Sequence, residues 1–212
     1  MSCIDAYIRS WRHSLPKNSH GALIEREIFS KIDPANPSRP GALMQDVKGF
    51  SRAILEAYSS TVPTVHEAEQ EVVYVVDGEG RIEAEGVAEK LSEGSAVLVP
   101  PKVSHVIVNE TRNPLELLIV REDAFPEAAQ RVGKSILVRD YHSLPTSVGG
   151  HWCHIVRKLF GDEDGLVTLH NVLVVSIDGM NIGEPHPHGP GTDEIWYQLE
   201  GTSLLFVGKE IR

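Results

Sequence analysis

Cysteine is scarce in this sequence, and its two copies lie far apart. Cys3 and Cys153 are separated by 150 positions and form no paired spacing. This arrangement fits neither a disulfide framework nor a zinc ribbon. Aromatic residues are also few, at 6% of the chain, whereas 18 glycines and 13 prolines are present. Because glycine and proline favour turns, this composition favours an all-β protein over a helical one.

Positive charge is also in short supply. The chain has 20 lysines and arginines against 30 aspartates and glutamates, a net charge of −10, and it has no basic run. Such a chain binds nucleic acids and anionic membranes poorly. No apolar run approaches the ~20 residues that span a bilayer, and the first residues lack the basic and apolar regions of a signal peptide. We therefore expect a cytoplasmic protein without a nucleic-acid or membrane partner.

Three segments of the sequence recur in the same order. The recurring pairs are Ile8–Pro16 with Val138–Pro145, Arg26–Phe29 with Arg157–Phe160, and Glu71–Gly78 with Glu194–Gly201. The spacing between the copies shortens from 130 to 123 residues, as short changes in loops would produce. Ordered matches of this kind indicate two copies of one structural unit. We expect an N-terminal domain at residues 1–122, a linker at 123–134 and a C-terminal domain at 135–212.

The first copy consists of short strands separated by turn signals. We predict strands within residues 51–59, 71–76, 81–85, 96–99, 105–108 and 115–120, which are rich in β-branched or alternating apolar residues. Asp77-Gly78-Glu79-Gly80 is a turn cluster between two of them. Short strands at regular spacing favour a sandwich or a barrel.

The stretch Pro185–Gly201 carries a candidate chemical site. In an extended strand, His186 and His188 project to the same side. We expect Glu194 to open a second strand that brings a carboxylate to the two imidazoles. Two neutral imidazoles and one carboxylate suit a divalent transition metal. The alternative interpretation is a solvent-exposed loop, because short motifs often match by chance.

These residues resemble a motif of the cupin superfamily. The family's first motif is G-x5-H-x-H-x(3,4)-E-x6-G, and His186, His188, Glu194 and Gly201 match it, with five residues between His188 and Glu194. The resemblance implies that the two histidines and the glutamate bind a metal. The fourth ligand of this copy is expected near position 228, so the chain is either a fragment or completed by a partner subunit.

The first copy matches the family's second motif, G-x5-P-x-G-x2-H-x3-N. Gly94, Pro100, His105 and Asn109 fall on this spacing, with Lys102 where the family has glycine. Its first motif is partly lost. Glu71 and His66 fit, whereas Thr64 stands at the first histidine and Tyr58 at the leading glycine. By resemblance this site has His66, Glu71 and His105 as metal ligands, and the alternative is a relic barrel that serves packing and dimerisation.

The resemblance implies two tandem double-stranded β-helix (jelly-roll) barrels, the second incomplete. It also implies a bound Fe, Mn, Zn or Ni ion, a small-molecule substrate and a homodimer. We expect a metal-dependent enzyme that acts on a small polar metabolite, with dioxygenation as one candidate reaction. The alternative is a non-catalytic module that binds a metal or a small ligand. The histidines without ligand spacing are expected at the surface or in the core: His13, His20, His142, His151, His154 and His170.

Overall fold

Strands make up almost all of the regular structure. The computed structural model describes residues 6–125, 132–148 and 151–211. The helical turns η2 (Trp11–His13), η4 (Tyr141–Ser143) and η5 (Asp162–Asp164) span three residues each. The expected all-β class is therefore confirmed. Within the described ranges, no helix is both long and apolar enough to cross a membrane.

Residues 16–123 supply eleven strands. Their bounds are β1 (Pro16–Ser19), β2 (Leu23–Lys31), β3 (Ala42–Met44), β4 (Val47–Leu55), β5 (Ser59–Ser60), β6 (Glu69–Asp77), β7 (Gly80–Ala84), β8 (Val87–Leu91), β9 (Ser95–Val99), β10 (His105–Asn109) and β11 (Leu115–Asp123). The strands predicted from 71 to 120 are all present. The stretch 51–59 is divided between the end of β4, a turn and the first residue of β5.

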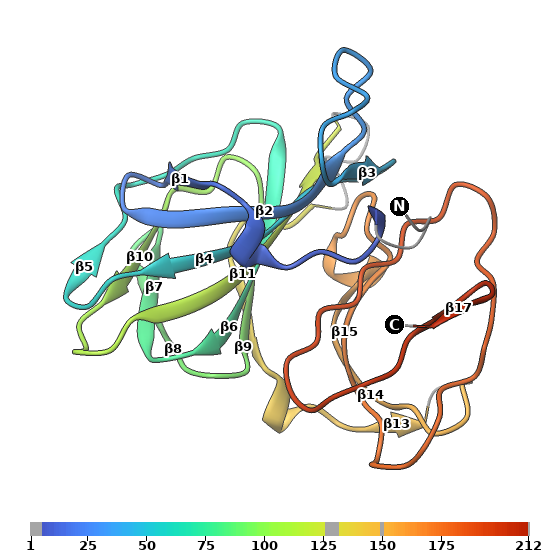
Figure 1. Cartoon of the computed structure of the whole chain (residues 1–212). Helices are drawn as coiled ribbons and strands as arrows, with labels where there is room; N and C mark the ends of the chain where they lie inside the picture. The colour runs from blue at the N-terminus through green and yellow to red at the C-terminus, as the bar shows by residue number, and fades with distance from the viewer. Residues whose placement is uncertain (1–5, 126–131, 149–150, 212) are drawn as a thin grey trace.

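The strands form two sheets that enclose one apolar core (Figure 1). The large sheet has the order β1-β2-β4-β11-β6-β9, followed by β12 (Leu137–Asp140), and β3 lies beside β2. The small sheet has the order β5-β10-β7-β8. Side chains from both sheets, such as Val75 of β6 and Ile107 of β10, share the core between them. The result is a barrel-like sandwich built from residues 16–123.

The large sheet is buried on both faces. Along β6, Val73 and Val75 face the core of the barrel, whereas Val72 and Tyr74 belong to a second apolar cluster on the outer face. Successive side chains of a strand point to opposite faces. A strand that is covered on both faces therefore has a continuous apolar run instead of an alternating one, which explains the sequence of residues 72–76.

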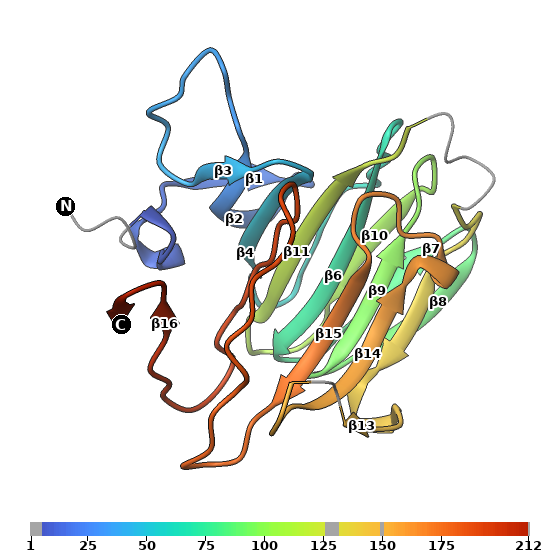
Figure 2. The same cartoon turned by 90° about the vertical axis from the view of Figure 1, so that its right-hand side faces the viewer.

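The C-terminal part of the chain covers this outer face. Its strands are β12, β13 (Ser147–Val148), β14 (Ile155–Gly161), β15 (Asn171–Ser176), β16 (Phe206–Val207) and β17 (Glu210–Ile211). Strand β12 extends the large sheet at β9, and β13-β14-β15 form a separate sheet. Leu159, Phe160 and Leu166 pack in the second apolar cluster. Figure 2 shows β14 and β15 in front of β6 and β9 of the large sheet. The expected domain boundaries stay a prediction, and residues 126–131 of the expected linker lie outside the described residues.

Two carboxylates also hold the C-terminal part against the barrel. Glu122 at the end of β11 is 1% exposed and accepts hydrogen bonds from the backbone N–H groups of Val167, Thr168 and Leu169 at 2.6–3.0 Å. Asp193 accepts from the backbone N–H groups of Gln45 and Asp46 at 2.7 and 2.9 Å. Hydrogen bonds to charged groups are stronger than neutral ones. The segment before Glu194 is thus fixed to the β3–β4 turn.

The two strands expected around His186 and Glu194 are absent. Residues 177–205 are all described, and they follow an irregular path without a strand. Pro185, Pro187 and Pro190 have no N–H to donate to a ladder. In the first copy β6 lies between β9 and β11, whereas no described strand pairs with residues 194–199. The repeated sequence at Glu194–Gly201 therefore lacks the neighbours that make Glu71–Gly78 a strand.

The buried side chain of Phe160 tests the packing between the two parts. Phe160 is 0% exposed in the second apolar cluster, and Phe→Ala changes in cores cost about 3–5 kcal/mol. We expect Phe160→Ala to lower the free energy of unfolding by this amount in urea titrations. The control Phe206→Ala removes a ring that is 61% exposed and should change it by less than about 0.5 kcal/mol. Equal effects of the two variants would contradict this packing.

Candidate metal centres

The turn between β1 and β2 positions His20. Ser19 pairs with Leu23 across the hairpin, so residues 20–22 form the connection. His20 has a positive φ of 50° and precedes Gly21, whose φ is 76°. The backbone carbonyl of His20 accepts from the N–H of Val62 at 2.9 Å. Its side chain is only 3% exposed, so the turn directs this imidazole into the barrel.

His66 and His105 come from two segments that lie side by side. The backbone groups of Thr64 and His105 exchange hydrogen bonds at 3.0 Å in both directions, which places His66 close to the start of β10. The hydroxyl of Thr64 donates to the carbonyl of Val62 at 2.9 Å. Thr64 therefore makes a local backbone contact where the family motif has a histidine.

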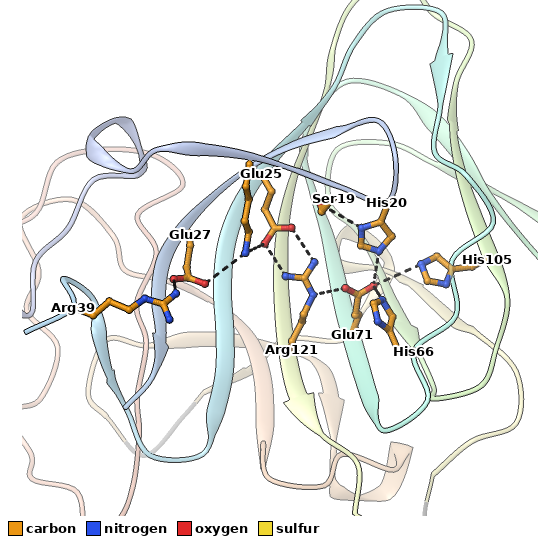
Figure 3. Close-up of polar contacts among 10 residues, drawn as sticks. Ser19, His20, Glu25, Glu27, Arg39, His66, Glu71, His105 and Arg121 are labelled. Carbon is orange, nitrogen blue, oxygen red and sulfur yellow. Dashed lines mark hydrogen bonds and ion pairs between the residues drawn. The ribbon is translucent and has the colours of Figure 1, made fainter. Parts of the chain in front are cut away.

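Glu71 is the centre of the first cluster (Figure 3). It lies on β6 on the face of Val73 and Val75 and is 0% exposed. Its Oε2 atom lies 3.2 Å from Nε2 of His20, 3.2 Å from Nε2 of His66 and 3.6 Å from Nε2 of His105. One oxygen atom thus faces three imidazoles that come from three separate parts of the barrel.

The second oxygen of Glu71 is held by Arg121. Arg121 lies directly opposite Glu71 in the β6–β11 pair, and its Nε donates to Oε1 of Glu71 at 2.6 Å. Its two terminal nitrogens donate to both oxygens of Glu25 at 2.7 and 3.0 Å. Figure 3 shows the guanidinium between the two carboxylates. Arg121 therefore orients Glu71 so that a single carboxylate oxygen faces the histidines.

The pKa values of the cluster follow from burial and from these contacts. Burial by itself raises the pKa of Glu71, but His20, His66 and Arg121 outweigh it and hold the pKa well below its ordinary value. Burial lowers the pKa of His105. The contact with Glu71 raises the pKa of His66 against the effect of burial. The cluster thus holds an ionised carboxylate beside an imidazole that is neutral at neutral pH.

The first cluster fits a divalent transition metal. Donor atoms of His20, His66, Glu71 and His105 all lie within 4.8 Å of one another. Nε2 of His105 is buried and lacks a hydrogen-bond partner, and a buried polar atom without a partner is costly. A carbonyl oxygen accepts only, so the contact of His105 Nδ1 with the carbonyl of Val103 at 3.4 Å leaves the lone pair on Nε2. This unpaired lone pair beside the carboxylate of Glu71 fits a bound cation.

The second cluster contains His186, His188 and Glu194. Nε2 of His188 lies 3.2 Å from Nε2 of His186 and 3.0 Å from Oε2 of Glu194. Nδ1 of His186 donates to the carbonyl of Glu184 at 2.8 Å, which leaves the lone pair of His186 on Nε2. Donor atoms of these three residues lie within 4.8 Å of one another. This cluster is on an irregular and more exposed segment, with side chains of His188 and Glu194 40% and 41% exposed.

The sequence indicated six of the seven residues in the two clusters but missed His20. His20 was expected at the surface or in the core, because it lies 46 positions before His66 and outside any motif spacing. The structure instead places it in the first cluster, where it supplies a third imidazole in addition to those of His66 and His105. The only signal in the sequence was indirect. The motif lacks its first histidine, and the segment before it contains His20.

The barrel also matches a known domain in its sequence. Residues 53–121 match the family described as Cupin domain (Cupin_2). Residues 53–121 are therefore a cupin domain. The matched part of this cupin contains His66, Glu71, His105 and Arg121, whereas His20 lies outside it. No curated protein matched the sequence.

Several solved structures are similar to this cupin. A protein from Pseudomonas aeruginosa, described as glyoxylate-induced, has a TM-score of 0.56 at 13% identity; the match covers 70% of this chain and 54% of that one. A predicted oxalate decarboxylase from Thermotoga maritima has a TM-score of 0.46 at 23% identity, over 55% of this chain and 98% of that one. KdgF from a Halomonas species has a TM-score of 0.43 at 17% identity, over 57% of this chain and 96% of that one. At these identities the likeness shows the fold alone.

Removal of the His20 imidazole tests the first cluster. A ligand that binds only the folded state stabilises it by about 2.7 kcal/mol at 100 times its Kd. If His20→Ala weakens metal binding tenfold, the same metal concentration gives only about 1.4 kcal/mol. We expect this smaller stabilisation by metal when the free energy of unfolding is measured in urea with and without Zn²⁺, Mn²⁺ or Ni²⁺. His13→Ala, which removes an exposed histidine, is the control, and an unchanged metal effect in His20→Ala would exclude His20 as a ligand.

The buried pair of Glu25 and Arg121 predicts a pH dependence of stability. Burial by itself raises the pKa of Glu25, but Arg121 outweighs this effect and the pKa falls from 4.5 to about 2. A lowered pKa in the folded state stabilises the protein above the unfolded-state pKa, and this contribution is lost as pH falls toward the folded-state pKa. The shift corresponds to about 3 kcal/mol.

Between pH 6 and pH 2, the free energy of unfolding should fall further in the wild type than in Glu25→Gln. We expect the difference between the two falls to be about 3 kcal/mol. The measurement is urea unfolding at a series of pH values. Glu89→Gln, on the exposed strand β8, controls for the loss of one negative charge. Parallel pH profiles for the wild type and Glu25→Gln would show that this pair does not titrate as described.

Proposed function

We propose that this cupin is a metal-dependent enzyme that acts on a small polar metabolite, with the reacting site in the N-terminal barrel. The observation that carries the proposal is the enclosed set of three imidazoles and one carboxylate at His20, His66, Glu71 and His105. Such a set suits Fe, Mn, Zn or Ni. When bound, the metal supplies a Lewis acid, and in the case of iron a centre that activates dioxygen.

The charges around the site favour an anionic substrate. The carboxylates of Glu25 and Glu71 are paired with the guanidinium of Arg121, and the ammonium of Lys17 lies 3.4 Å from Glu25. The two carboxylates and the two cations sum to zero, so a divalent cation gives the centre a net positive charge. Acids and hydroxy acids have the oxygen atoms that such a centre binds. This supports a small carboxylate as the substrate.

The protein's own residues orient and enclose the site. Arg121 holds one oxygen of Glu71 and prevents it from turning away from the histidines. The side chain of His66 is 21% exposed, against 3% or less for His20, Glu71 and His105, so a substrate approaches from the side of His66. The apolar core of the barrel excludes water behind the cluster and strengthens electrostatic interactions within it.

A second function is favoured by the number of donors. Structural metal sites use four protein ligands, whereas catalytic zinc sites keep one position open. The first cluster has four donors, which also fits a non-catalytic module that stores a metal or uses it to bind a ligand. The second cluster at His186, His188 and Glu194 has three donors, and we propose that it binds a second metal ion.

Metal-dependent turnover tests the enzyme proposal. The purified full chain, reconstituted separately with Fe²⁺, Mn²⁺, Zn²⁺ or Ni²⁺, is incubated with a panel of small carboxylic acids while O₂ uptake and products are followed. We expect turnover with at least one metal and its loss in His66→Ala, since loss of a ligand weakens binding at least about tenfold. His170→Ala, an exposed histidine, should retain turnover.

The outcomes separate the two functions. Turnover that survives chelation, or that is unaffected by His66→Ala, would contradict a reaction at the first cluster. Tight metal binding without turnover on any acid would favour the non-catalytic module. Consumption of O₂ together with the acid would support a dioxygenase, whereas release of CO₂ without O₂ uptake would support a decarboxylase.

A further inference from the structure

His151 occupies the same place in the second copy as His20 in the first. His20 precedes Arg26 by six positions, and His151 precedes Arg157 by six positions. His20 lies in the connection from β1 to β2, and His151 lies in the connection from β13 to β14. In both copies the hairpin follows a three-residue turn, η2 or η4. The side chain before each turn, Ser10 or Asp140, accepts from the N–H of the turn's second residue. The two histidines therefore hold the same position in the repeated sequence, and each precedes the second strand of its hairpin.

His151 also lies beside the second cluster. Its ring stacks on that of His186, with centroids 4.1 Å apart and an angle of 12° between the planes. His186 in turn lies 4.9 Å from His188, centroid to centroid. Nδ1 of His151 is buried and has no hydrogen-bond partner, and Oε2 of Glu184 is 3.7 Å away. His151 thus lies beside the second cluster and has a buried nitrogen that no hydrogen bond occupies.

The donor sets of the two clusters become alike when His151 is included. The first cluster has three imidazoles and one carboxylate. His186, His188 and Glu194 provide two imidazoles and one carboxylate, and His151 adds the third imidazole. His151 is 44% exposed at its side chain, so its side-chain torsions are free to turn the ring toward an ion.

We propose that His151 is the fourth ligand of a divalent metal bound by His186, His188 and Glu194, so that each copy takes one ligand from its hairpin turn. The inference rests on metal binding at the second cluster, which is part of the proposed function, and it does not depend on turnover. Nearby His154 is a different case. It is 5% exposed and takes the place of Leu23 of the first copy, a core residue.

Titration of the metal-free full chain with Co²⁺ tests this inference by absorption spectroscopy. We expect two equivalents to bind to the wild type, one in each cluster. His151→Ala should weaken the second equivalent at least about tenfold, as expected for loss of a ligand, and leave the first equivalent unchanged. His20→Ala should do the reverse. His142→Ala, an exposed histidine of η4, and His154→Leu are matched controls that should retain both equivalents.

A cysteine at position 151 distinguishes a ligand from a stacking residue. If His151 is a ligand, His151→Cys should produce a thiolate-to-cobalt charge-transfer band that the wild type lacks, because a thiolate coordinates Co²⁺ directly. Circular dichroism of each variant shows whether it is folded.

Three results would overturn the inference. The first is a His151→Ala variant with unchanged affinity and spectrum for the second equivalent. The second is a folded His151→Cys variant without the band. The third is a wild type that binds one equivalent and is unaffected by His186→Ala, which would exclude metal binding at the second cluster and leave the proposal for the first cluster standing.

Discussion

The paired charges of Glu71, Arg121 and Glu25 are the interaction on which the barrel's centre depends. A buried carboxylate without a partner costs several kcal/mol, and both Glu71 and Glu25 are 0% exposed. Arg121 satisfies both of them at once, with one nitrogen on Glu71 and two on Glu25. Glu25 lies on β2, Arg121 on β11 and Glu71 on β6, and β4 separates β2 from β11 in the large sheet. The register of these four strands therefore determines whether Glu71 faces the histidines.

The leading arm, the residues before β2, contributes His20 to the first cluster of candidate ligands. The family motif places two histidines in one segment, but here Thr64 has replaced the first and His20 supplies an imidazole from the β1–β2 turn. The carbonyl of His20 accepts from Val62, two residues before Thr64. Folding of the arm onto the barrel and assembly of the cluster therefore depend on the same contacts. In the second copy, His151 lies between β13 and β14 and stacks on His186.

The C-terminal copy has a structural role that does not depend on a second barrel. Its Leu159, Phe160 and Leu166 bury the outer face of the large sheet, and β12 covers the edge of β9. An exposed sheet edge and a bare apolar face both favour aggregation. Strands predicted by repetition at residues 186–199 did not form, because a strand needs neighbours with which to pair, and sequence similarity to β6 does not supply them.

The sequence by itself determined the all-β class, the strands predicted between residues 71 and 120, and six of the seven residues in the two clusters. These follow from local information: β-branched runs, turn residues and the fixed spacing of motifs along one or two strands. The tertiary structure alone decided the rest. His20 joins Glu71 across 51 positions, and Arg121 reaches it across 50, because hairpin turns and strand register bring distant residues together. Such contacts leave no spacing signal in a single sequence, since the loops between them can change length without moving the strands.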